Sequence, residues 1–326
     1  MHSGVLSDYF EDTLTPLLRL KPAFLLRDGI FSPYERTRRQ QGQLQSVLSR
    51  RTAMRENFIS LHQLEAVSWQ DSPDGNVLRP AALIAGIGEQ IRADISLLGK
   101  EFSSAKEKNL QIEGNRDELF VHSGAIISPH AVFDTTQGPI VIDAEARVAA
   151  FCLVKGPIYI GARTQLDSCH IANSIVGTEC RLGGEISDSV IGSFTNKHHE
   201  GFVGHSLIGD WVNLGALTTT SDLKNNYGEV RLTFAGDKYS SGTIKFGCVI
   251  GDYAKTAIGT MLGTGSIVDL GANLFGLSHR SGYFRPFLWG ETKIYDRNKF
   301  IEDAGRMMQR RGQSVTPALE KMLRGI

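Results

Sequence analysis

Small aliphatic residues recur every six positions through the middle of the chain, and a glycine often follows them. One register holds for five steps from Ile142 to Ala172, restarts at Val176-Gly177, and continues through Ile208-Gly209 and Ile250-Gly251. A period of six is neither the 3.6-residue period of an amphipathic helix nor the alternation of a half-buried strand. It is typical of a solenoid in which each hexad forms one short strand and a turn. The aliphatic side chain points inward, and the glycine relieves crowding at the corner.

Three hexads make a triangular turn of about 18 residues, so the repeat predicts a mainly β fold, a left-handed parallel β-helix, over residues 113–282. One stretch, Leu223 to Gly247, has no hexad and carries strand-like segments at Val230–Phe234 and Thr243–Phe246. An insertion into a solenoid leaves on one face as a loop, and such loops often line the functional groove. A plain surface hairpin is the alternative interpretation of this segment.

Residues 283–326 are predicted to form a helical tail. An apolar stripe at helical spacing marks the first helix, and Thr316-Pro317 marks the start of a second, with Thr316 as N-cap. The stripe consists of Phe300, Ile301, Ala304, Met307 and Met308.

Residues 1–112 differ in kind and predict a small α/β region. Strands are expected at Phe24–Leu26 and Val77–Ile84, and a helix over the charged, glutamine-rich segment from Arg36 to Arg55. No glycine-rich phosphate loop with a following lysine is present in the sequence.

The composition excludes several classes of protein. Lys and Arg together number 35, as do Asp and Glu, so there is no basic excess that would favour a nucleic-acid partner. The sequence starts without a charged segment and apolar core of the signal-peptide type, and the longest apolar stretch, Ala81–Ile87, is too short to span a bilayer. We therefore expect a soluble cytoplasmic protein without a membrane partner. The four cysteines show neither a CxxC pair nor metal-ligand spacing, so we expect buried, reduced thiols and no metal site.

One polar cluster, Lys197-His198-His199-Glu200, interrupts the apolar hexads and is the strongest candidate for chemistry. Histidine suits a general base, because its unperturbed pKa of about 6.5 lies close to neutral pH. Asn213 and Thr218-Thr219-Thr220 follow within the next part of the repeat. Each has a structural alternative: Asn213 as a corner residue bonded to its own backbone, and the threonines as plain strand residues.

Three stretches of the sequence resemble the GlmU-like sugar-phosphate nucleotidyltransferase/acetyltransferase proteins. They are VHSGAIISPHAVFDTTQGPIVIDAEARVAAFCLVKGPIYIG from Val121, NKHHEGFVGHSLIGDWVNLGALTTTSDLKNNYG from Asn196, and YFRPFLWGETKIYD from Tyr283. A shorter stretch, FEDTLTPLLRLKPAFLLRDGIFSPYER from Phe10, resembles the start of the family's nucleotidyltransferase domain. The resemblance makes residues 1–112 a shortened nucleotidyltransferase-like region. It implies acetyl transfer from acetyl-CoA to glucosamine-1-phosphate, toward UDP-N-acetylglucosamine, by a homotrimer with grooves between subunits.

The resemblance also assigns residues, when the chain is aligned through Gly204 and Gly209. The family's acetyltransferase base falls on His199, Asn213 matches an asparagine that contacts the substrate, and Ala216 matches a residue whose backbone lies against the CoA arm. The predicted site comprises His199 as the catalytic base, Lys197, Asn213, Lys224 and Asn225 as substrate ligands, and Gly215, Ala216 and Thr218 as acetyl-CoA ligands.

The chain departs from the family in two ways. Phe202 stands where the family has a tyrosine that touches the sugar phosphate, and the family's basic phosphate ligands have no match in register; Lys197 and Lys224 are candidate substitutes. Nearby basic residues without the register are Lys155, Arg163 and Arg181. A working nucleotidyltransferase domain needs roughly 200 residues, more than precede the coil. The acceptor sugar and the acyl group are therefore open.

Two other functions compete with acetyl transfer. The first is uridylyl or thymidylyl transfer to a sugar-1-phosphate in the N-terminal region, with Arg19, Lys21 and Arg27 on phosphates. A magnesium ion is implied only for that reaction. The second is a non-catalytic scaffold that binds a sugar nucleotide.

Overall fold

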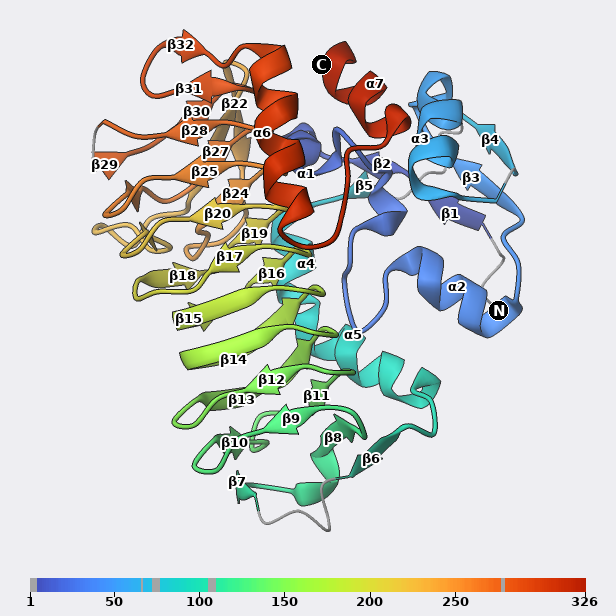
Figure 1. Ribbon diagram of the computed structural model, residues 1–326, viewed down its shortest axis with the longest axis vertical. Helices are drawn as coiled ribbons and strands as arrows, with labels where there is room; N and C mark the ends of the chain where they lie inside the picture. Colours follow the sequence, from blue (N-terminus) through green and yellow to red (C-terminus); the bar gives the residue numbers. More distant parts are fainter. Residues whose placement is uncertain (1–4, 66, 72–76, 105–109, 277–278) are drawn as a thin grey trace.

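Short parallel strands wind most of the chain into a three-sided coil (Figure 1). The structure is a computed structural model that describes residues 5–65, 67–71, 77–104, 110–276 and 279–326. Each strand pairs in parallel with the strand one turn further along, so that Phe133 lies beside Val154 and Val148 beside Leu166. Strands on three faces in each turn form a parallel β-helix, as the hexads predict, while its handedness stays a prediction.

The strands divide among three faces, and the long strands bend around corners: β13 and β15 contribute to two faces each, and β14 contributes to all three. Face 1 contains β7 (Gln111–Glu113), β10 (Val132–Asp134), parts of β13 (Leu153–Ile160), β14 (Gln165–Val176) and β15 (Arg181–Ser187), β18 (Phe202–Gly204), β21 (Thr219–Thr220), β26 (Met261–Leu262) and β29 (His279–Arg280). Face 2 contains β8 (Leu119–His122), β11 (Ile140–Ile142), parts of β13 and β14, β16 (Val190–Ile191), β19 (Leu207–Ile208), β24 (Cys248–Ile250), β27 (Ser266–Val268) and β30 (Tyr283–Phe284). Face 3 contains β9 (Ile126–Ile127), β12 (Arg147–Val148), parts of β14 and β15, β17 (Asn196–Lys197), β20 (Asn213–Leu214), β25 (Lys255–Thr256), β28 (Asn273–Leu274) and β31 (Leu288–Trp289). Two antiparallel strands lie at the ends of the coil, β6 (Phe102–Ser104) beside β8 and β32 (Lys293–Ile294) beside β31.

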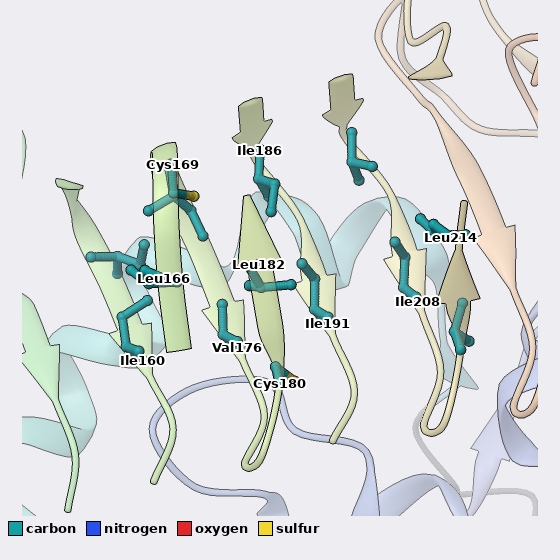
Figure 2. Close-up of a cluster of buried hydrophobic side chains, with 14 of the residues drawn as sticks. Ile160, Leu166, Cys169, Val176, Cys180, Leu182, Ile186, Ile191, Ile208 and Leu214 are labelled. Carbon is teal, nitrogen blue, oxygen red and sulfur yellow. The ribbon is translucent and has the colours of Figure 1, made fainter. Parts of the chain in front are cut away.

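The interior of the coil is a stack of aliphatic side chains and thiols (Figure 2). All positions of the first hexad register lie in this core except Ala172. The prediction for Ala172 is wrong because the coil shortens at the corner after Leu166, and Ile171 takes the inward place instead. The four cysteines are free and buried, as predicted. Burial raises the pKa of the Cys180 and Cys248 thiols to about 12.

Face 2 is buried on both sides. Outward side chains of its strands, among them Val141, Tyr159 and Ile267, pack in a second core with Leu83 of α4 (Pro80–Ala85) and Ile91 of α5 (Ile87–Asp94). Figure 1 shows these two helices running along the coil between its strands and the N-terminal elements. Apolar side chains on both sides of a strand are therefore required on this face.

The N-terminal region is a small α/β unit, as predicted. Its parallel sheet consists of β1 (Val5–Ser7), β3 (Ser46–Leu48) and β4 (Ser68–Gln70), and its other elements are β2 (Tyr9–Phe10), β5 (Val77–Leu78), η1 (Asp12–Leu14), α1 (Thr15–Leu18), η2 (Ala23–Leu25), α2 (Pro33–Gln41), η3 (Thr52–Met54), α3 (Arg55–His62) and η4 (Ile95–Leu97). The strand expected at Phe24–Leu26 is wrong, because that segment is mostly a 3-10 turn. The strand expected at Val77–Ile84 ends early, because Pro80 begins α4. The helix expected from Arg36 to Arg55 is interrupted by Gly42, with φ of 79°, and by β3.

The two predicted tail helices are present, α6 (Arg297–Gln309) and α7 (Pro317–Gly325), but the helical part begins later than residue 283, because β30, β31 and β32 precede it. The Thr316 hydroxyl accepts a hydrogen bond from the backbone N–H of Leu319 at 3.2 Å, as expected of an N-cap. Side chains from both ends of the chain, including Phe24, Phe58 and Phe300, share a third core. Within the described residues, no helix has both the length and the apolar character that crossing a membrane requires.

The insertion between Leu223 and Gly247 contains an antiparallel hairpin of β22 (Arg231–Phe234) and β23 (Asp237–Ser240). The first predicted strand is confirmed, and the second is wrong by several residues. The reason is a tight turn at Ala235-Gly236, where both residues have positive φ, so the chain reverses immediately after Phe234.

Candidate functional site

His199 lies on the turn that joins face 3 to face 1, between β17 and β18. Its side chain is exposed, and its ring packs edge-on against the ring of His198, with centroids 5.0 Å apart. Gly201 ends the turn with φ of 127°, and a Cβ there would lie 2.2 Å from the carbonyl oxygen of Thr218 on the next turn of the coil. Only glycine fits that place, so the backbone around His199 is fixed by the coil itself.

Lys197 points into the coil, where Leu182 and Leu214 occupy the equivalent inward places on neighbouring turns. It is 2% exposed. Its ammonium donates to the carbonyl oxygen of Gly183 at 2.9 Å and to that of His199 at 2.6 Å. Burial lowers the pKa of Lys197 to about 8. This corrects the expectation of a substrate ligand, because the ammonium is bound to interior carbonyls. Lys197 instead holds the backbone of the turn that carries His199.

Asn213 faces outward at the start of β20. Asn196 holds the equivalent place on β17 and donates from Nδ2 to Oδ1 of Asn213 at 2.9 Å. Within the described part of the chain, Nδ2 of Asn213 has no hydrogen-bond partner, so it is free to donate to a ligand. The amide thus lies on the outer surface of face 3, on the turn of the coil next to the one that carries His199.

Thr218 differs from its prediction as an acetyl-CoA ligand. It is fully buried, and its hydroxyl lies 2.7 Å from the hydroxyl of Thr256, so the interpretation as a plain coil residue fits it. The backbone N–H of Gly215 bonds to the Thr256 carbonyl at 3.2 Å, and the Ala216 carbonyl accepts from Gly259 at 2.8 Å. Gly215 and Ala216 are nevertheless half-buried at the surface, which leaves their role against a CoA arm as a prediction.

Lys224 and Asn225 lie in the insertion, between β21 and β22. The Lys224 ammonium donates to the backbone carbonyl of Glu229 in the same loop, and Asn225 is exposed. Among the described residues, no hydrogen bond or ion pair joins either of them to His199. Their role as substrate ligands stays a prediction.

An apolar strip that sequence reasoning missed lies beside the His199 turn. Its residues are Leu217, Ile258 and Met261, whose side chains are 56%, 76% and 54% exposed. The backbone N–H of Leu217 donates to the carbonyl of Glu200 at 2.8 Å, which places Leu217 on the turn of the coil next to His199; Ile258 and Met261 lie one turn further along the coil. The sequence signal that could have revealed these residues is an apolar side chain outside the hexad register, because residues within the register point inward.

The three cations expected on phosphates in a nucleotidyl transfer reaction bind carboxylates of this protein instead. Their partners are Asp269 for Arg19, Asp210 and Asp252 for Lys21, and Glu35 for Arg27. Arg19 makes two hydrogen bonds of 2.7 Å to its buried partner. Arg19 and Lys21 therefore attach the N-terminal region to the coil, which argues against phosphate binding by either.

No protein-family model matches the chain. The chain is similar to curated relatives over part of its length. It is 40% identical over 95 residues to the bifunctional protein GlmU of Methanococcus vannielii, covering 27% of this chain and 22% of the relative. It is 35% identical over 88 residues to a bifunctional sugar-1-phosphate nucleotidylyltransferase/acetyltransferase of Sulfurisphaera tokodaii, covering 27% and 21%. It is 35% identical over 151 residues to GlmU of a Picosynechococcus species, covering 45% and 28%. The chain thus spans less than a third of each of these relatives, and the resemblance to GlmU-like proteins is confirmed over that part.

Among solved structures, two similar chains are acyltransferases. One is a variant of AntD, an N-acyltransferase from Bacillus cereus in complex with dTDP-4-amino-4,6-dideoxyglucose and coenzyme A. It has 13% identity and a TM-score of 0.27, and the match covers 44% of this chain and 91% of that one. The other is the acetyltransferase domain of PglB from Neisseria gonorrhoeae with acetyl coenzyme A, at 12% identity and a TM-score of 0.14, covering 67% and 87%.

Proposed function

We propose that this protein is an N-acetyltransferase that moves an acetyl group from acetyl-CoA to the amine of an amino-sugar phosphate of the glucosamine-1-phosphate type. The observation that carries the proposal is His199, an exposed imidazole on a turn whose backbone is held by the buried Lys197 ammonium and by Gly201. The partial similarity to the bifunctional sugar-1-phosphate nucleotidylyltransferase/acetyltransferase of Sulfurisphaera tokodaii supports it.

In this reaction the acceptor amine attacks the thioester carbonyl carbon, a C–N bond forms, and the C–S bond breaks to release the CoA thiol. His199 accepts the proton that the amine loses, and the thiolate receives a proton on leaving. A base with a pKa near neutrality is suited to this step, and a positioned base typically contributes about 10²–10⁴-fold. Asn213 offers Nδ2 as a donor to the sugar, and its oxygen is already held by Asn196.

The surroundings of His199 also suit the acetyl donor. The apolar strip of Leu217, Ile258 and Met261 offers a surface for the apolar part of the CoA arm, next to the backbone of Gly215 and Ala216. We propose a left-handed coil that assembles as a cytoplasmic homotrimer, in which a neighbouring subunit covers this strip. Exposed apolar side chains grouped at one corner support such a contact.

The test is release of free thiol from acetyl-CoA in the presence of glucosamine-1-phosphate or another amino-sugar phosphate. We expect His199→Gln to lower kcat by about 10²–10⁴-fold. His198→Gln is the matched control on the same turn, with an expected change under tenfold. Because all four cysteines are buried, the protein's own thiols contribute little to the signal.

Undiminished thiol release by His199→Gln would remove His199 as the base. No release with any amino-sugar phosphate, together with pyrophosphate release from UTP and magnesium, would favour nucleotidyl transfer. No turnover in either assay would favour the non-catalytic scaffold. A monomer mass in light scattering would contradict the homotrimer.

A further inference from the structure

A cavity of about 160 Å³ lies between face 3 of the coil and the end of α6. Arg181, Asn196 and Asn213 begin consecutive strands β15, β17 and β20 and are register partners, so they form one outward column on the coil. Arg310 and Arg311 follow the last turn of α6 and close the opposite side. One buried water needs about 10–15 Å³, so the cavity admits a phosphate group and part of the molecule that carries it.

The charge of this cavity is strongly positive. Three guanidinium groups line it, and no carboxylate is among the described residues that do. Glu179, two residues before Arg181 in the sequence, forms an ion pair with Arg163. Arg311 donates to the backbone carbonyl of Glu179 at 3.5 Å and not to its carboxylate. Arg310 is exposed. Burial, and then the charge of Arg181, lower the pKa of Arg311.

Arg181 also has an unsatisfied donor. Its Nε is buried and has no hydrogen-bond partner within the described part of the chain. Leaving a buried donor unpaired destabilises the folded protein, and more so for a charged group. The negative end of the α6 dipole explains why cations follow that helix. The helix dipole does not explain why Arg181, on the coil, lines the same cavity as these two arginines with an unpaired Nε. An oxyanion in the cavity removes both the repulsion and the unpaired donor.

We propose that this cavity binds the phosphate group of a phosphate monoester through Arg181, Arg310 and Arg311. Guanidinium groups donate paired, charge-assisted hydrogen bonds to phosphate oxygens, and the Nδ2 of Asn213 adds a neutral donor. Asn213 also belongs to the proposed acetyl-transfer site, and His199 is the second residue after β17. The tail helix therefore supplies basic groups that the coil does not hold in register. The identity of the monoester rests on the proposed acetyltransferase function, whereas anion binding does not.

The experiment measures dissociation constants of the full chain by calorimetry for glucosamine-1-phosphate, CoA, 3′-dephospho-CoA and inorganic phosphate. We expect Arg311→Gln to weaken binding of at least one organic phosphate tenfold or more, and Arg181→Gln to do the same. Arg306→Gln is the matched control, because it removes the same charge from α6 at a side chain that is 64% exposed and does not line the cavity. Its expected change is under twofold. Arg310→Gln, at an exposed position, repeats the test if Arg181→Gln fails to fold.

The probes separate the sources of the phosphate. Loss of CoA binding without an effect on 3′-dephospho-CoA assigns the cavity to the 3′-phosphate of CoA. Loss of glucosamine-1-phosphate binding assigns it to the acceptor. Binding that depends on these arginines, in a protein that transfers no acetyl group, supports the anion site while the proposed function fails. Unchanged affinity for all four probes in both arginine variants, or no binding by the wild-type protein, overturns the inference.

Discussion

Lys197→Met is expected to remove the rise in the free energy of unfolding that the titration of Lys197 produces between about pH 8 and 10.5. In the folded protein the Lys197 ammonium is buried inside the coil, and burial lowers its pKa from an ordinary 10.5 to about 8. At about 1.36 kcal/mol per pKa unit, keeping this group charged in the folded state costs about 3 kcal/mol at pH 7. Because the folded pKa lies below the unfolded one, the unfolded chain binds more protons between pH 8 and 10.5. The free energy of unfolding of the wild type therefore rises by about 3 kcal/mol as the pH rises through that window, because the cost of keeping the buried group charged disappears.

The measurement is the difference in free energy of unfolding between wild type and Lys197→Met, from urea titrations at one protein concentration between pH 7 and 10.5. We expect the difference to shift in favour of the wild type by about 3 kcal/mol across this range. The lost packing of the buried lysine side chain adds an offset at every pH, so it does not affect the slope. Lys238→Met, at an exposed residue, controls for the loss of one positive charge.

A difference that stays flat between pH 7 and 10.5 would refute the placement of the Lys197 ammonium in the interior. Titration of the tyrosines and of the other thiols cancels in the difference, because those groups are present in both proteins. The Cys169 thiol interacts with Lys197, but burial raises its pKa so far that it stays protonated in the folded protein across this range.

Three further predictions concern stability and reactivity. Lys21→Met leaves Asp210 and Asp252 close together without their shared cation, so we expect a loss of about 3–5 kcal/mol in urea unfolding at pH 7; a loss below 1 kcal/mol would contradict this buried attachment. Gly201→Ala forces a Cβ against the Thr218 carbonyl, so we expect a loss of at least about 2 kcal/mol, and an unchanged midpoint would show that the turn is misplaced. The four cysteines should resist a thiol reagent at pH 8 in the native protein and all react after unfolding, because they are buried; rapid native labelling would disprove that burial.

The repeat was predictable because the core of a solenoid depends on local spacing. A small apolar residue every six positions is enough to place one inward side chain on each face, and most of the predicted positions, from Ile142 to Leu274, do lie in the core. The tail helices were predictable for a similar reason, since the apolar stripe and the Thr316 cap are local signals. The errors at Ala172 and in the second hairpin strand arise where a corner shortens or a tight turn reverses the chain.

The candidate site was predictable in part. His199 and Asn213 were found from the polar cluster and the family resemblance, and both lie at the surface of the coil. Lys197 and Thr218 were expected to contact ligands, yet both lie inside. Whether a side chain on a two-residue strand points inward depends on the number of residues in each corner, and the corners between residues 166 and 203 vary in length.

The sequence by itself determined the coil and the turn that carries His199, because these depend on spacing between near neighbours. Only the tertiary structure decided which groups lie next to the basic side chains of Arg19, Lys21 and Arg311. Arg19 and Lys21 meet coil carboxylates that are far away in the sequence, and Arg311 lines one cavity with Arg181. Electrostatic partners are set by distance in space, and no local pattern records which distant segment packs against the coil.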